Sequence, residues 1–123
     1  MLDAIKSVMK WNEIAWNKDS FNRHLETSML SEELAEALIA MKEKDNVELV
    51  DGILDVFWVW MWTLYKLGMT PEQINSCFEE IRDSNYSKFE KDSNGNFKVL
   101  KDSSGKILKP EAYFKPNLEK YLK

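Results

Sequence analysis

Hydrophobic residues recur at the spacing of amphipathic helices through most of the first 86 positions of the chain. Residues 1–18 form the first predicted helix, and the polar stretch 17–22 forms a connection. A second helix is expected over 27–44, with Ser28 or Ser31 as its cap and acidic residues in its first turn, where the helix dipole favours them. The apolar stripe of this second helix consists of Leu30, Leu34, Ala37, Leu38 and Met41.

Two further helices are predicted before residue 88. The third covers 46–67 and ends before Gly68, a typical C-terminal stop. Its stretch 53–65 is apolar on nearly every side, which is typical of a buried helix, and its uncharged core is too short for a bilayer, which takes about 20 residues. A capping Thr70, Pro71 at the first helical position and Gln73 then start a fourth helix, which reaches residue 86.

After residue 88 the sequence becomes polar and is interrupted by glycine and proline. The segments 97–100 and 106–109 flank the turn-like stretch 102–105, which predicts a small β-hairpin. No internal repeat or long linker is evident. The expected fold class is therefore all-α, with a four-helix catalytic domain over 1–88. An arm, residues 89–123, would pack on the same domain or on a neighbouring subunit.

Composition and charge narrow the class of protein. A chain of 123 residues with 44% hydrophobic and 31% charged residues is one globular domain. A net charge of −4 argues against non-specific nucleic-acid binding. The single Cys77 excludes an internal disulfide and a cysteine-rich zinc site. No signal peptide or membrane span is evident, so a cytoplasmic location without nucleic-acid or membrane partners is expected.

Acidic residues on the predicted second and third helices are the main candidates for chemistry. At about 100° per residue, Glu33 and Glu36 point the same way, as do Glu48 and Asp51. Two carboxylate pairs on consecutive helices can converge, and clustered carboxylates bind hard cations such as Mg²⁺, which bridge them to phosphates. A solvated helix face is the alternative interpretation of the same spacing.

Two neighbours strengthen the metal hypothesis. Asp55 starts the apolar stretch of the third helix, where an unpaired carboxylate would be costly. Gly52 costs about 1 kcal/mol in a helix interior relative to alanine, so it can serve to admit a close neighbour. The five tryptophans are expected mostly in the core or at a subunit interface, although Trp11 or Trp16 could stack on a base.

The acidic residues also form a family motif. Glu32-Glu33-x-x-Glu36, followed after eleven residues by Glu48-x-x-Asp51, resembles the signature of the all-α MazG-like nucleoside triphosphate pyrophosphohydrolases. The stretch 48–56 is similar to the form found in phage and bacterial members. The C-terminal pattern of the short members is matched by Ser84-Asn85-Tyr86-Ser87-Lys88, Gly105-Lys106, Lys109-Pro110, Tyr113, Pro116 and Leu118.

The resemblance implies a MazG-like bundle that hydrolyses a nucleoside triphosphate between its α- and β-phosphates. It implies Mg²⁺, with Mn²⁺ as a substitute, held by Glu33, Glu36, Glu48 and Asp51. It also implies that Asn85 and Lys88 contact the nucleotide, although two residues separate them here where many relatives have Asn-x-Lys. Completion of the site by a homodimer or homotetramer is implied as well.

The chemistry of the reaction suggests roles for further residues. Among the catalytic candidates Glu32, Glu33 and Asp55, a carboxylate that does not bind metal could accept the proton of the attacking water or orient a ligand. Lys106 and Lys109 on the arm could add positive charge around the phosphates.

Two alternatives remain open. One is a sibling activity, that of an all-α dUTP pyrophosphatase or a phosphoribosyl-ATP pyrophosphohydrolase. The other, from a different class, is a non-catalytic helical interaction module whose acidic residues are merely solvated.

Overall fold

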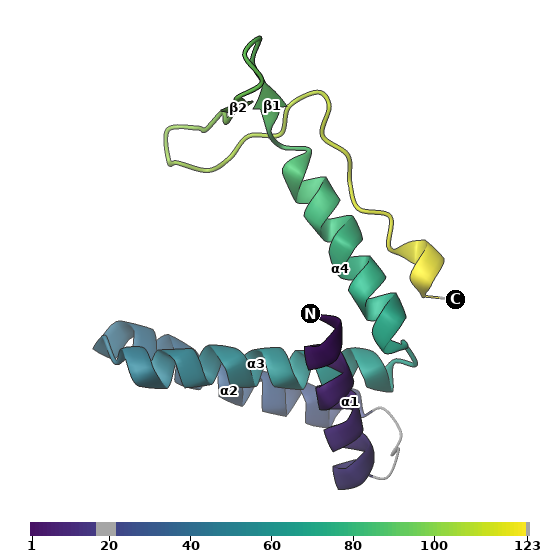
Figure 1. Cartoon of the computed structure of the whole chain (residues 1–123). Helices are drawn as coiled ribbons and strands as arrows, with labels where there is room; N and C mark the ends of the chain where they lie inside the picture. Colours follow the sequence, from purple (N-terminus) through teal and green to yellow (C-terminus); the bar gives the residue numbers. More distant parts are fainter. Residues whose placement is uncertain (17–21, 123) are drawn as a thin grey trace. The chain divides into compact units, whose positions relative to one another are not determined.

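The structure, a computed structural model, describes residues 1–16 and 22–122. These residues form helices α1 (Leu2–Trp16), α2 (Arg23–Glu43), α3 (Asn46–Lys66) and α4 (Pro71–Tyr86), strands β1 (Glu90–Lys91) and β2 (Phe97–Lys98), and a 3₁₀ turn η1 (Glu119–Tyr121) (Figure 1). The predicted all-α class is confirmed. The chain divides into two compact units, Met1–Ile74 and Asn75–Lys123, whereas the functional division predicted at residue 88 stays a prediction.

Local capping chemistry fixes where the helices begin. Helix α2 starts earlier than predicted because Asn22 caps it, with its Oδ1 accepting from the Leu25 N–H at 3.1 Å. The prediction of Ser28 or Ser31 as the cap is wrong: both lie inside α2, and the Ser28 hydroxyl donates to the backbone carbonyl of His24 at 3.2 Å. The connection predicted before Asn22 lies outside the described residues.

The start of α4 follows the prediction. The Thr70 N–H donates to Gln73 Oε1 at 2.9 Å, and the Gln73 N–H donates back to Thr70 Oγ1 at 3.1 Å. These two bonds form the reciprocal capping box that the sequence predicts.

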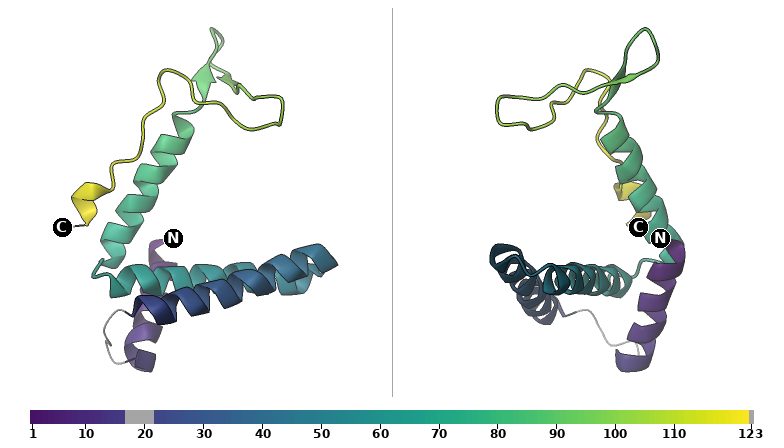
Figure 2. Two further views of the ribbon diagram at one scale, coloured as in Figure 1. Left: turned by 180° about the vertical axis from the view of Figure 1, so that it is seen from behind. Right: turned by 60° about the vertical axis from the view of Figure 1, so that its left-hand side comes forward.

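Helices α1, α2 and α3 build the first unit. Figures 1 and 2 show α2 and α3 side by side, with α1 crossing at the end where α2 begins and α3 ends. The core at this crossing includes Val8, Val59 and Trp62. Further along, a Cβ added to Gly52 would lie only 3.0 Å from the Cα and Cβ atoms of Ala37, so the two helix backbones come close there. The expectation that Gly52 admits a close neighbour is confirmed.

Helix α3 is less buried in this single chain than its composition predicts. Ile53, Leu54 and Trp60 are 51%, 60% and 54% exposed. Asp55 is exposed too, so the prediction that it is a buried carboxylate is wrong. On α2 only Ala37 of the predicted apolar stripe is fully buried, whereas Leu34, Leu38 and Met41 are exposed. The reason is that α1 and α3 cover only a narrow part of the surface of α2. Among the described residues no helix has the length and apolarity needed to cross a membrane.

In the second unit the C-terminal segment runs back along α4, as both views of Figure 2 show. The Ser84 hydroxyl donates to the carbonyl of Phe114 at 2.8 Å, and the Phe114 N–H donates to Ser87 Oγ at 3.1 Å. One turn earlier on the helix, the Asn117 N–H donates to Glu80 Oε1 at 3.0 Å. The segment is therefore held by helix side chains that bind its backbone.

Two turns of similar sequence precede this segment. Residues 91–95 and 101–105 share the pattern Lys-Asp-Ser-x-Gly. In each turn an aspartate Oδ1 accepts two backbone N–H groups, and a glycine adopts positive φ. The predicted hairpin at 97–109 exists as a single bridge between Lys101 and Ile107, whereas the regular strand pair β1–β2 surrounds the earlier turn.

Candidate active site

The predicted catalytic and metal-binding carboxylates lie on α2 and α3 in the first unit. Glu33 is half-buried, whereas the other five are exposed; these are Glu32, Glu36, Glu48, Asp51 and Asp55. The close approach of the two helices at Gly52 places the carboxylates of α2 beside those of α3. The convergence of the two carboxylate pairs on one point stays a prediction.

Glu33 is the centre of this acidic face. Its Oε2 atom is buried and has no hydrogen-bond partner among the described residues. Burial raises the pKa of Glu33, and the negative charges of Asp55, Glu36, Glu32 and Asp51 raise it further. Because a carboxylate desolvated among like charges is costly, a cation at this position would relieve both penalties. The donor set is all carboxylate oxygen, which suits Mg²⁺ or Mn²⁺.

Glu36 and Glu48 also line a shallow groove of about 210 Å³ where α2 ends and α3 begins. Glu43 and Asp45 border the same groove. Within the described part of the chain, no three acidic, histidine or cysteine side chains are close enough together to form a ready-made set of metal ligands. The carboxylates therefore share one face without being gathered around one point.

An aromatic cavity of about 330 Å³ adjoins this face, and we call it the indole cavity. Its walls include Trp11, Trp58 and Trp62, and Glu33 and Asp55 line it on the acidic side. The Trp11 ring stacks parallel to that of Trp62, with centroids 5.5 Å apart, and meets the edge of Trp58 at 5.8 Å. A flat apolar group bound there would lie directly beside the carboxylates.

Sequence reasoning missed the support beneath these aromatic rings. Glu26 of α2 is buried, and its Oε2 accepts from Trp62 Nε1 at 2.6 Å and from the Thr63 hydroxyl at 2.7 Å. Its Oε1 pairs with Lys66 Nζ at 3.0 Å, and both side chains are almost fully buried. The available signal was Lys66 itself, a cation that directly follows the apolar stretch of α3 and therefore needs a counter-ion.

The predicted nucleotide-binding residues all lie in the second unit. Lys88 Nζ donates to Asn85 Oδ1 at 3.2 Å, so the two predicted partners contact each other. Lys109 Nζ lies over the Tyr113 ring, 5.0 Å from its centroid, and Lys106 is held in its turn by a backbone bond to Asp102. Residues 88–123 contain nine lysines and five acidic residues, whereas 1–87 contain eight basic and sixteen acidic residues. The two parts of the sequence thus carry net charges of opposite sign.

Comparison with known proteins identifies one family. The family described as PRA-PH, phosphoribosyl-ATP pyrophosphohydrolase, matches residues 5–85, about two thirds of the chain. This match includes all six acidic candidates and Asn85. Comparisons with curated proteins and with solved structures return no match.

Proposed function

Since the chain belongs to the phosphoribosyl-ATP pyrophosphohydrolase family and is therefore a pyrophosphohydrolase, a hydrolase acting on acid anhydrides, we propose that it hydrolyses nucleoside triphosphates. The substrates are deoxynucleotides or modified nucleotides, and the products are a nucleoside monophosphate and pyrophosphate. The observation that carries this proposal is Glu33, whose buried carboxylate oxygen has no hydrogen-bond partner among the described residues and is close to four other carboxylates. Such a position favours a divalent cation, and a triphosphate is a substrate that divalent cations bridge to carboxylates.

In this proposal Glu33, Glu36, Glu48 and Asp51 hold Mg²⁺. The bound metal would neutralise the triphosphate and lower the pKa of the attacking water. Glu32 or Asp55, both on the acidic face, takes up the proton of that water. Asp55 also lines the indole cavity, which we propose below as the site of the nucleobase.

The remaining residues bind the substrate. A nucleobase fits the indole cavity, where Trp11 and Trp58 offer aromatic surface. Asn85 and Lys88 contact the nucleotide. Lys106 and Lys109 add positive charge around the phosphates, where it stabilises the negative charge that develops in the reaction.

Phosphoribosyl-ATP itself is the second candidate substrate, and the description of the matching family favours it. An all-α dUTP pyrophosphatase would use the same acidic face with a different base. A panel of canonical and modified nucleoside triphosphates, dUTP and phosphoribosyl-ATP, assayed with Mg²⁺ for pyrophosphate release, separates these substrates.

Substitution of the acidic residues tests the proposal. Glu36→Gln and Asp51→Asn preserve size but remove one metal ligand each, so Mg²⁺-dependent turnover should fall by about a hundredfold or more. Saturable Mg²⁺ binding, measured by calorimetry, should weaken in parallel. Asp3→Asn and Glu111→Gln remove the same charges from exposed positions and serve as matched controls that keep full activity.

The melting temperature without metal is the second measurement on each variant. Clustered carboxylates repel one another when no cation is present, and each substitution removes one of these charges. The melting temperature of the variant without metal should therefore equal or exceed that of the unaltered chain. Full activity in both metal-site variants would eliminate the metal cluster. Absence of any saturable Mg²⁺ site in the unaltered chain would favour the alternative of a non-catalytic helical interaction module.

A further inference from the structure

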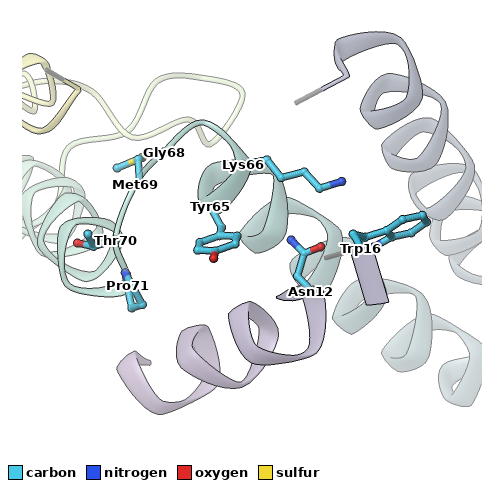
Figure 3. A pocket seen from close by; sticks show the side chains of 8 residues that line it. All are labelled: Asn12, Trp16, Tyr65, Lys66, Gly68, Met69, Thr70 and Pro71. Carbon is cyan, nitrogen blue, oxygen red and sulfur yellow. The ribbon is translucent and has the colours of Figure 1, made fainter. Parts of the chain in front are cut away.

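A second cavity in the first unit is distinct from the acidic face. It measures about 340 Å³ and is lined by Asn12 and Trp16 of α1, Tyr65 and Lys66 of α3, and the segment 68–71 (Figure 3). We call it the Asn12 cavity. It shares no lining residue with the indole cavity. Lys66 follows Asp55 by eleven positions on one helix, which corresponds to about 16 Å.

The polar atoms of this cavity are unusual because several of them are buried without partners. Asn12 is only 2% exposed, yet neither its Oδ1 nor its Nδ2 has a hydrogen-bond partner among the described residues. The Nε1 of Trp16 is buried and unpartnered as well. In the view of Figure 3 the Asn12 side chain lies between the rings of Tyr65 and Trp16. Since buried polar groups nearly always have partners, these three atoms can receive hydrogen bonds from, or donate them to, a bound molecule.

The other polar groups of the cavity are already engaged. Lys66 Nζ is paired with Glu26 at 3.0 Å and lies 5.1 Å from the centroid of the Trp16 ring. The Tyr65 hydroxyl donates to Glu13 Oε1 at 2.7 Å. The ammonium charge is therefore balanced within the protein, so the cavity does not select for a phosphate or a carboxylate. The buried atoms that have no partner among the described residues are one acceptor oxygen, Asn12 Oδ1, and two donor nitrogens, Asn12 Nδ2 and Trp16 Nε1.

We propose that the Asn12 cavity binds a neutral, planar ring with an imide edge, that is, an N–H between two carbonyl groups. Asn12 Oδ1 accepts from the ligand N–H, Asn12 Nδ2 donates to one carbonyl, and Trp16 Nε1 donates to the other. Asn12 and Trp16 are four residues apart, so they project from the same face of α1. The volume falls in the usual range for small-molecule sites. The ligand site is independent of the proposed function.

Two probes of nearly equal shape test the edge directly. In 1-methyluracil the ring offers the imide edge alone, whereas in 1,3-dimethyluracil a methyl group blocks its N–H. Nitrogen-resolved NMR of the full chain reports on the Asn12 side-chain amide and the Trp16 indole N–H. We expect 1-methyluracil to shift both signals saturably and 1,3-dimethyluracil to bind at least about tenfold more weakly, since the central hydrogen bond is lost.

Variants of the cavity residues locate the binding. Asn12→Leu removes two hydrogen bonds and should weaken 1-methyluracil binding by about tenfold to a hundredfold. It should also raise the melting temperature without ligand, because no unpartnered amide remains buried, so the variant is expected to fold. Trp16→Phe keeps an aromatic ring but loses the indole N–H, and it should bind more weakly than the unaltered chain. Lys10→Leu, at an exposed position on the same helix, is the control that binds normally.

Three outcomes would overturn the inference. They are the absence of any saturable shift at the solubility limit of 1-methyluracil, equal binding of the two probes, and undiminished binding by Asn12→Leu. The first outcome leaves water as the only occupant of the cavity. Glu36→Gln, which tests the proposed function, should bind 1-methyluracil like the unaltered chain; loss of binding in that variant would place the probe at the acidic face and overturn the separate site.

Discussion

At the scale of single residues, Glu26 is a buried carboxylate whose neighbours favour its charged form. Burial alone would raise the pKa of Glu26, but hydrogen bonds from Thr63, Trp62 and Lys66, together with the charge of Lys66, lower it below its ordinary value of 4.5. The same Trp62 stacks against Trp11 in the wall of the indole cavity. Glu26 therefore fixes aromatic rings that stand beside the acidic face.

Replacement of Glu26 by glutamine should lower the free energy of unfolding by about 3 kcal/mol at neutral pH, because Lys66 would be left buried without a counter-ion. Folding lowers the pKa of Glu26 below 4.5. The stability that the ionised Glu26 carboxylate contributes is therefore complete above pH 4.5, and it is lost as the pH falls through the pKa of Glu26 in the folded chain. The difference between the variant and the unaltered chain should therefore shrink in acid. Urea unfolding of the variant and of the unaltered chain, at neutral pH and at about pH 3, measures this difference in the free energy of unfolding.

A double variant controls for the loss of the pair itself. Glu26→Gln with Lys66→Met removes both charges but keeps an amide oxygen that can accept from Trp62 Nε1 and the Thr63 hydroxyl, and it should recover much of the lost stability. A loss that is equal at both pH values, or a double variant less stable than Glu26→Gln, would contradict the assignment of a stabilising charged pair.

Spacing along the chain predicted part of this chemistry. It predicted that the acidic faces of the second and third helices meet, because helical periodicity and a short connection decide which faces of two consecutive helices meet, and the charges of Asp51 and Asp55 do act on Glu33. It could not predict that Glu33 is the carboxylate with the buried, unpaired oxygen, nor that Asn12 is buried. Burial depends on side chains that come together across many residues, as Glu26 and Lys66 do from positions 40 apart.

At the scale of the helices, the contact between α2 and α3 depends on Gly52. A methyl group there would meet the backbone and the Cβ of Ala37 at 3.0 Å, so the helices would have to separate. The two effects of Gly52→Ala oppose each other: helix propensity gains about 1 kcal/mol, whereas overpacking costs about 1–3 kcal/mol. We expect net destabilisation, because the contact is with backbone that cannot rotate away.

The same substitution should also lower Mg²⁺-dependent turnover, since it moves the acidic residues of α2 relative to those of α3. Thermal melting and pyrophosphate release are the measurements. Adding Ala37→Gly removes one of the two close atoms and should restore part of the stability. If Gly52→Ala is more stable than the unaltered chain and fully active, the two helices are not held at this distance.

Helix positions were predictable because capping and periodicity are local signals, as the box at Thr70 and Gln73 shows. The position of the β-hairpin was not, because both Lys-Asp-Ser-x-Gly segments carry the same turn signal. Both turns form, and the regular strand pair occurs where Phe89 and Phe97 pack together across it, with ring centroids 5.7 Å apart. That cross-strand contact is not visible in the turn sequence.

At the scale of the whole molecule, one face of α3 has no packing partner among the described residues of the first unit. Val50, Ile53, Leu54 and Trp60 are exposed and cluster on this face by helical spacing. Exposed apolar patches of this kind mark sites of association. The predicted dimer or tetramer, with α3 near the centre of its interface, would cover these residues and explain why a helix with a buried composition is exposed here.

We therefore expect the chain to be a dimer or tetramer at micromolar concentration in light scattering. Trp60→Glu should weaken association by at least about thirtyfold, because a large aromatic residue at an interface centre commonly contributes 2 kcal/mol or more. Its helical circular dichroism should be unchanged, since Trp60 does not belong to the core of the first unit. Ile14→Glu, which adds the same charge at an exposed apolar position on α1, should leave the oligomer intact. If the unaltered chain is a monomer, or if both variants dissociate alike, then the exposed face of α3 is not the interface.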